Sequence, residues 1–268
     1  MLDRKTKKMA SETIQFKIEN GVAFITLNRP KVFNSFNREM SLALQSALDT
    51  CEKSADVRCI YLTGEGKAFC AGQDLQEAMD PAAPDITQIV EEHYNPIILR
   101  LRNIEKPILA AVNGVAAGAG ANIALASDIV VAKHSAKFIQ AFSNIGLVPD
   151  SGGTFTLPRL VGWQKASALM MLGDRIGGEE AERMGMIYKS FDDESFEEES
   201  NKIAAKLATM PTQALGQTKV LLNASLNNNL EDQLTLEGVH QTKAADSEDF
   251  AEGVNAFLEK RKPVFKGK

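Results

Sequence analysis

AVNGVAAGAGAN, residues 111–122, is the stretch that decides the fold, because almost every side chain in it is small. It follows an apolar run typical of a buried strand, residues 107–110, and precedes an apolar run typical of a helix, residues 123–126. A strand that passes through small residues into a helix leaves backbone N–H groups bare at the helix start. We therefore predict that the main chain here binds an oxygen that gains negative charge.

A second segment has the same organisation. Residues 57–63 are typical of a buried strand, residues 64–67 of a turn, and AFCAGQDL, residues 68–75, is again rich in small residues before a helix. Two such strand ends are able to donate one N–H each to a single carbonyl oxygen. That arrangement is an oxyanion hole.

These motifs together carry a family resemblance. FCAGQDL at residues 69–75 and AVNGVAAGAG at residues 111–120 resemble the crotonase (enoyl-CoA hydratase/isomerase) superfamily, and the resemblance runs from VAFITLNRP at residues 22–30 to PVFK at residues 263–266. SNIGLVPDSGGT, residues 143–154, is most similar to the branch that isomerises ring-1,2-epoxyphenylacetyl-CoA. The resemblance implies an α/β fold, a spiral of repeated ββα units with a C-terminal helical trimerisation region.

Composition limits the class of protein. The 268 residues, 44% of them apolar, suit one large domain or a domain with an appendage. A formal charge of −5 argues against nucleic acid or an anionic membrane as the main partner. The three cysteines have no metal-ligand spacing and fit a reducing compartment, and no metal is expected. Since neither a signal peptide nor a membrane-spanning run is evident, we expect a cytoplasmic protein.

The order of the predicted elements supports an α/β core. Asn20-Gly21 predicts a hairpin between residues 13–18 and 22–28. The pattern then predicts these elements: a helix at 36–54, a strand at 57–63, a mobile loop at 78–85, a helix at 86–104, and further strands and helices through 107–141. Strands that alternate with helices indicate a parallel sheet.

Beyond Gly162 the pattern predicts mainly helices, at residues 164–172, 178–184, 194–210, 212–227 and 230–244. We divide the chain into a disordered tail (1–10), a spiral core (11–210) and a C-terminal helical region (211–268). The resemblance implies that the last region builds a homotrimer, and a homohexamer from two trimers. Its apolar content is equally consistent with a self-contained helical layer.

The family motif, matched position by position, places the two oxyanion amides at Gln73 and Ala119. Hydratases of the family use two glutamates, and the matching positions here hold Asn122 and Phe142, which exchange no proton at neutral pH. The resemblance leaves Asp150 as the acid/base, as in the isomerase branch. The alternative reading of Asp150 is a helix N-cap.

The remaining candidates concern substrate binding. Phe142 and Tyr94 would make the acyl pocket apolar, or would simply pack in the core, and a dry pocket would raise the pKa of Asp150. The resemblance implies that CoA is bound by the turn at 28–34, by backbone near the first oxyanion segment and by the C-terminal tail, in part from a neighbouring subunit. The lysines there are alternatively solvated surface charges. The predicted binding residues are Lys31, Val32, Phe33, Ala71, Leu75, Gly118, Asn122, Phe142, Tyr94, Phe265 and Lys266.

One carboxylate suits isomerisation better than hydration, which must also activate water. We therefore expect an acyl-CoA isomerase, and the resemblance of residues 143–154 implies conversion of 2-(1,2-epoxy-1,2-dihydrophenyl)acetyl-CoA to oxepin-CoA. The alternatives are a Δ3-Δ2-enoyl-CoA isomerase, an enoyl-CoA hydratase and a catalytically silent CoA-ester-binding protein. No separate cofactor is expected, because CoA is part of the substrate; residues 118–120 lack the third glycine of a dinucleotide-binding motif.

Overall fold

The computed structural model describes residues 11–80 and 84–268. The predicted disordered tail, residues 1–10, lies outside the described residues, as do residues 81–83 of the predicted loop. Within the described ranges, no helix is both long enough and apolar enough to cross a membrane.

Two sheets form the centre of the molecule. The larger sheet has six strands, in the order β1 (Ile14–Glu19), β2 (Val22–Leu27), β3 (Cys59–Gly64), β5 (Ile108–Val112), β7 (Ile129–Lys133) and β10 (Lys189–Phe191). The smaller sheet has four, in the order β4 (Ala68–Cys70), β6 (Val115–Ala117), β8 (Lys137–Ile139) and β9 (Arg175–Gly177). Apart from the antiparallel pairs β1/β2 and β8/β9, neighbouring strands are parallel. The predicted α/β class is confirmed.

The helices follow the predicted pattern closely. They are η1 (Pro30–Val32), α1 (Arg38–Lys53), α2 (Leu75–Ala78), α3 (Ile86–Gln88), η2 (Ile89–Tyr94), α4 (Asn95–Asn103), α5 (Ala119–Leu125), η3 (Ala141–Ile145), α6 (Gly153–Val161), α7 (Trp163–Leu172), α8 (Gly178–Arg183), α9 (Phe196–Thr209), α10 (Thr212–Ser225), α11 (Leu230–Ala245) and α12 (Glu248–Leu258). Three features differ from prediction. The helix expected at 86–104 contains a π-helical turn, η2; strands β9 and β10 interrupt the helical second half; and α12 follows the predicted helices.

Local chemistry explains the first elements. The hairpin turn has positive φ at both Asn20 (49°) and Gly21 (81°), which is the geometry of the turn that joins twisted antiparallel strands. Helix α1 begins after Asn37, whose side chain accepts a hydrogen bond from the backbone N–H of Met40. Its buried face includes Leu44 and Leu48, which belong to the main apolar core.

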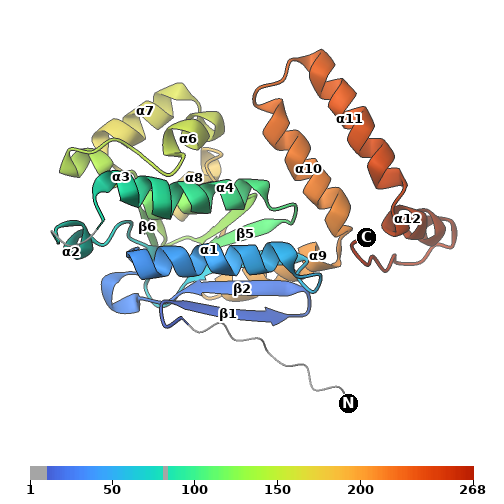
Figure 1. Cartoon of the computed structure of the whole chain (residues 1–268), viewed down its shortest axis with the longest axis horizontal. Coiled ribbons are helices and arrows are strands. Elements are labelled where there is room, and N and C mark those ends of the chain that lie inside the picture. The colour runs from blue at the N-terminus through green and yellow to red at the C-terminus, as the bar shows by residue number, and fades with distance from the viewer. Residues whose placement is uncertain (1–10, 81–83) are drawn as a thin grey trace.

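Helices cover both faces of the large sheet. Helices α1 and α4 lie on one face, and α9 packs against strands β2, β3, β7 and β10 (Figure 1). A second apolar cluster, which includes Tyr61, Phe196 and Ala204, fills the space between α9 and the sheet. Helices α10 and α11 extend away from the sheets side by side (Figure 1). The predicted division at residue 210 falls between α9 and α10 and stays a prediction.

Two polar clusters attach the C-terminal region to the core. Arg58, which precedes β3, donates hydrogen bonds to Thr212 Oγ1 (2.9 Å), to the carbonyl oxygen of Met210 (2.7 Å) and to that of Phe265 (2.6 Å). Lys219 of α10 lies 2.9 Å from the Asp128 carboxylate and is almost fully buried. The start of α10 and the C-terminal tail are thereby held against the sheet.

Candidate active site

The two small-residue segments meet at the ends of β4 and β6. These strands pair in parallel, with Cys70 opposite Ala116, and each runs into a glycine with positive φ, 95° at Gly72 and 53° at Gly118. A Cβ built on Gly72 would lie 3.0 Å from the Ala117 carbonyl oxygen and 3.7 Å from the Ala119 nitrogen. The predicted oxyanion segments are therefore in contact, as the sequence implies.

The amides of Gln73 and Ala119 are both unused in the described part of the chain. Ala119 is the first residue of α5, so its N–H has no acceptor within the helix. Gln73 lies in a parallel bridge with Phe36, but the bonds of that bridge run from Phe36 N to Gly72 O (2.7 Å) and from Asp74 N to Phe36 O (2.8 Å). Two neighbouring backbone donors are thus left for a ligand oxygen.

Asp150 lies on the turn that precedes α6. Its Oδ1 accepts a hydrogen bond from Ser151 Oγ (2.8 Å), and its carbonyl oxygen accepts one from Gly153 N (2.9 Å). Burial raises the pKa of the Asp150 carboxyl, and the Ser151 bond opposes that rise. The N-cap of α6 is Gly152, with no side-chain capping bond. The alternative reading of Asp150 as the N-cap is therefore wrong.

Asn122, which occupies a hydratase glutamate position, supports the Asp150 turn. Its Nδ2 donates to the Asp150 carbonyl oxygen (2.9 Å), and its Oδ1 accepts from Gln140 Nε2 (2.8 Å). The side chain is buried, and a Cβ on Gly153 would lie only 2.3 Å from its Nδ2. Both the Nδ2 and the Oδ1 of Asn122 are hydrogen-bonded within the protein. Asn122 therefore supports the Asp150 turn and is not open to solvent.

Two predicted aromatic residues lie beside the oxyanion segments. Phe142 is buried in η3, and its ring would lie 3.8 Å from a Cβ built on Gly118. Tyr94 is buried at the end of η2, and its hydroxyl donates to Gln73 Oε1 (2.7 Å). Burial raises the pKa of Tyr94 well above its usual value, and the negative charges of Asp150 and Glu77 act in the same direction. Tyr94 therefore lies within electrostatic range of Asp150.

The predicted CoA turn is joined to the first oxyanion segment. The backbone N–H of Ala71 donates to the Phe33 carbonyl oxygen (3.0 Å), and Arg29 Nη2 lies 2.9 Å from Asp74 Oδ2. Lys31 and Phe33 are exposed, and so is Leu75 at the start of α2. The structure thus brings the residues predicted for CoA near the oxyanion segment, with their side chains accessible.

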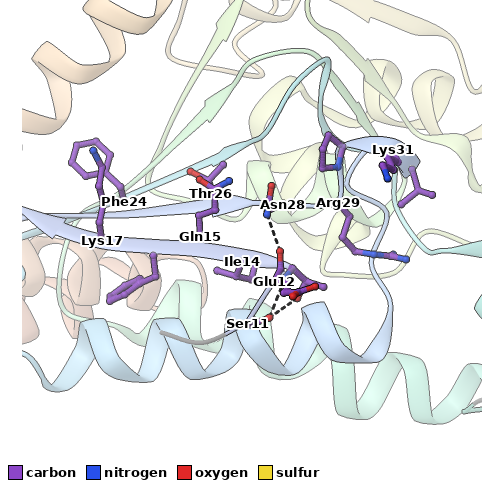
Figure 2. A pocket seen from close by; sticks show the side chains of 14 residues that line it. Ser11, Glu12, Ile14, Gln15, Lys17, Phe24, Thr26, Asn28, Arg29 and Lys31 are labelled. Carbon is purple, nitrogen blue, oxygen red and sulfur yellow. Dashed lines mark hydrogen bonds between the residues drawn. The ribbon is translucent and has the colours of Figure 1, made fainter. Parts of the chain in front are cut away.

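A groove runs along the hairpin and ends at this turn. Figure 2 shows Lys17 and Phe24 at one end and Arg29 and Lys31 at the other. The lining residues drawn in Figure 2 include Arg29 and Lys31, so the groove includes part of the predicted CoA turn.

Phe265 and Lys266 lie elsewhere in the same chain. The Lys266 backbone N–H donates to Asp249 Oδ1 (2.6 Å), and the Phe265 carbonyl oxygen is bound by Arg58 (2.6 Å). Arg58 lies just before the first residue of β3. The first oxyanion segment comes after the last residue of β3, at the opposite end of the strand. One chain does not bring these two residues to the site, so their predicted role requires a neighbouring copy.

Sequence reasoning missed several residues that hold the site. They include the Arg29–Asp74 ion pair, which is mostly buried, and Asn34, whose Nδ2 donates to the carbonyl oxygen of Ala68 (2.8 Å). Ser151 was also missed. The NRP and GQD motifs contain Arg29 and Asp74, but only the three-dimensional structure shows that they pair across 45 residues.

Comparison with known proteins identifies the family. The model of the enoyl-CoA hydratase/isomerase family matches residues 17–268, and the chain belongs to that family. The 1,2-epoxyphenylacetyl-CoA isomerase of Escherichia coli K12 is 48% identical to it over 96% of this chain and 99% of the relative. The trans-2-decenoyl-[acyl-carrier-protein] isomerase of Streptococcus mutans is 36% identical over 97% of this chain and 100% of the relative.

The fold agrees equally well with solved structures. The enoyl-CoA hydratase from Bacillus anthracis superposes with a TM-score of 0.89 at 31% identity, covering 96% of this chain and 100% of that chain. The resemblance to the crotonase superfamily is therefore confirmed, and the protein is an enzyme of the acyl-CoA isomerase or hydratase type.

Proposed function

We propose that the protein isomerises 2-(1,2-epoxy-1,2-dihydrophenyl)acetyl-CoA to oxepin-CoA, a step of phenylacetate breakdown. The observation that carries the proposal is the site itself: two unused amides, at Gln73 and Ala119, with Asp150 as the acid/base on a turn whose carbonyl oxygen Asn122 binds. The identity to the isomerase from Escherichia coli supports the choice of substrate.

In this mechanism the amides of Gln73 and Ala119 donate to the thioester carbonyl oxygen. Their donation stabilises the enolate that forms when the α-carbon loses a proton. Asp150 takes that proton and returns it to a ring carbon as the ring opens to the oxepin, so no atom is gained or lost. Burial raises the pKa of Asp150, which makes its carboxylate a stronger base towards the α-proton.

The CoA moiety would be bound by Lys31, Val32, Phe33, Ala71, Leu75 and Gly118, with Phe142 and Tyr94 against the acyl group. The free, exposed side chains of Lys31 and Phe33 support this assignment. CoA enters as part of the substrate, and the proposed reaction needs no separate cofactor. The three buried, free cysteines support a reducing, cytoplasmic location.

We also propose that the protein is a homotrimer or a dimer of trimers. Helix α11 has no buried residue in the single chain, and exposed apolar side chains continue along α12. Such an apolar surface is typical of a protein interface. A neighbouring copy would also be the source of the Phe265 and Lys266 contacts.

The experiment compares turnover of the ring-epoxide ester and of a 3-enoyl-CoA by the wild type and by Asp150→Asn. We expect the wild type to form oxepin-CoA and the variant to bind the ester with less than about 1% of the turnover. Unchanged turnover by the variant would remove Asp150 from the mechanism.

The same assay decides between the other candidate functions. A preference for the 3-enoyl ester would assign a Δ3-Δ2-enoyl-CoA isomerase, which uses the same amides and the same acid. Addition of water to a 2-enoyl ester would assign a hydratase, which Asn122 disfavours because its amide is engaged at both ends. Binding of the esters without turnover would assign a silent CoA-ester-binding protein.

A further inference from the structure

We propose that Tyr94 is a positioning residue that fixes the Gln73 amide, an inference that rests on the oxyanion hole proposed above. The Tyr94 side chain is only 1% exposed, and its hydroxyl donates to Gln73 Oε1 at 2.7 Å. Gln73 carries the proposed amide donor. A buried hydroxyl that is hydrogen-bonded to the Gln73 side chain restricts the orientation of Gln73.

The peptide between Gly72 and Gln73 needs such a restraint. Glycine permits a wide range of backbone conformations, and Gly72 is held at a φ of 95°. The Gln73 side chain is fixed at both ends, because its Nε2 donates to Glu77 Oε2 (3.3 Å) while Tyr94 binds its Oε1. With the Phe36 bridge holding the backbone on either side, the N–H of Gln73 keeps one direction.

The π-helical turn η2 positions Tyr94. In η2 the N–H of Asn95 donates to the Val90 carbonyl oxygen, five residues earlier, and a regular helix resumes with α4. The wider turn shifts the register of the side chains, and such turns are frequent at functional sites. The Tyr94 ring then packs edge-on against Phe36, with centroids 5.9 Å apart. The ring therefore contacts the residue that also holds the Gln73 backbone.

The phenol stays protonated over the working pH range. Burial is the main cause of its raised pKa, and the nearby negative charges of Asp150 and Glu77 act in the same direction. The hydroxyl is therefore a donor throughout.

The test removes the hydroxyl alone. Tyr94→Phe keeps the ring, and Tyr61→Phe is the matched control because Tyr61 is also buried and its hydroxyl lies 2.9 Å from Ser200 Oγ, on the α9 side of the sheet. Turnover of the ring-epoxide ester gives kcat and KM. The red shift in absorbance of bound trans-cinnamoyl-CoA reports polarisation of the thioester carbonyl without turnover.

We expect Tyr94→Phe to lower kcat by about 10- to 100-fold with KM within about 3-fold, and to lose most of the red shift. Tyr61→Phe should behave as the wild type in both measurements. If Tyr94→Phe does not fold, Gln73→Met removes the same hydrogen bond from the other side and should lose the red shift to a similar extent. Where both variants fold, the double variant should be no worse than either single variant.

The outcomes separate this role from the proposed reaction. A red shift in the wild type without turnover of the epoxide ester contradicts the proposed reaction and still tests Tyr94 through the shift. Absence of any shift in the wild type contradicts the oxyanion hole and the role of Tyr94 with it. A full shift and wild-type kcat in Tyr94→Phe would overturn the positioning role alone.

Discussion

At the scale of single residues, the site depends on how Asp150 is held. Its carboxyl is placed by a turn in which Ser151 has a positive φ (51°) and binds Oδ1, while Asn122 binds the main chain. Burial raises the pKa of the carboxyl and Ser151 lowers it, so the balance of the two sets the pH at which the group works.

Ser151→Ala should move the acid limb of the pH–rate profile to higher pH. As a base Asp150 must be ionised, so kcat/KM falls when the pH drops below its pKa, and loss of the Ser151 hydrogen bond raises that pKa further. The measurement is kcat/KM against pH for the variant and the wild type. Ser135→Ala, which removes the hydroxyl that donates to Asp193 Oδ2 on the surface, is the control and should leave the profile in place. A profile shifted to lower pH in Ser151→Ala would contradict the account.

Asn122→Ala should destabilise the protein by about 1–3 kcal/mol, because it leaves the buried Gln140 Nε2 without its acceptor and removes one of the two hydrogen bonds to the Asp150 carbonyl oxygen. It should also lower kcat, since the turn that carries Asp150 loses a restraint. Urea unfolding and steady-state kinetics measure the two effects. Asn255→Ala, on the exposed side of α12, should change neither. Wild-type stability in Asn122→Ala would remove Asn122 from the support of Asp150.

Part of this site could be predicted from the sequence. The rest could not, because it consists of contacts between residues that are far apart in the chain. The small-residue segments indicate backbone donors, and the family resemblance implies that these are Gln73 and Ala119 and that the acid is Asp150. The bonds from Tyr94 to Gln73 and from Asn122 to Asp150 join residues 21 and 28 positions apart. No local pattern encodes such pairs, since they depend on how separate elements pack.

At the scale of elements, α10 is attached to the core by a buried ion pair. Lys219 lies 2.9 Å from Asp128, which also accepts a hydrogen bond from the backbone N–H of Ile108 and lies 3.8 Å from Arg102. Burial lowers the pKa of Lys219 and raises that of Asp128, and each charge opposes the shift of the other. The pair therefore joins the C-terminal helices to the start of β5.

Lys219→Met should lower the free energy of unfolding by about 3 kcal/mol, because Asp128 is left buried with only the more distant Arg102 as a counter-charge. Adding Asp128→Asn should recover part of the loss. Lys202→Met, which removes an exposed ion pair on α9, is the control and should cost less than about 1 kcal/mol. Equal unfolding free energies for the Lys219 and Lys202 variants would contradict this role.

The two strands missed from the sequence share a property. Strands β9 and β10 have only three residues each, too few for the alternation of apolar and polar residues to identify a strand. Strand β10 becomes a strand because β7 offers an open edge beside it. The hairpin and α1, by contrast, carry their own turn and capping residues, so local sequence predicts them.

At the scale of the whole molecule, one chain leaves two groups of residues without a role. The apolar side chains of Phe250, Val254 and Phe257 occupy one face of α12 and are exposed, and the Phe265 and Lys266 segment lies far along β3 from the oxyanion amides. Assembly with further copies would account for both.

We expect the protein to be a trimer or a hexamer in solution, measured by native mass spectrometry or by sedimentation. The double variant Phe250→Glu/Phe257→Glu should shift it towards the monomer, because it places charge in the proposed apolar interface. Asn255→Glu, on another side of the same helix, should leave the assembly intact. A wild-type monomer at micromolar concentration would contradict the proposed assembly.

The central claim is that the amides of Gln73 and Ala119 bind the same oxygen beside Asp150. A crystal structure with phenylacetyl-CoA bound tests it most directly. The account predicts a thioester oxygen about 2.7–3.1 Å from both nitrogens, with the α-carbon facing the Asp150 carboxyl. A thioester oxygen bound by other groups, or an α-carbon facing away from Asp150, would contradict the account.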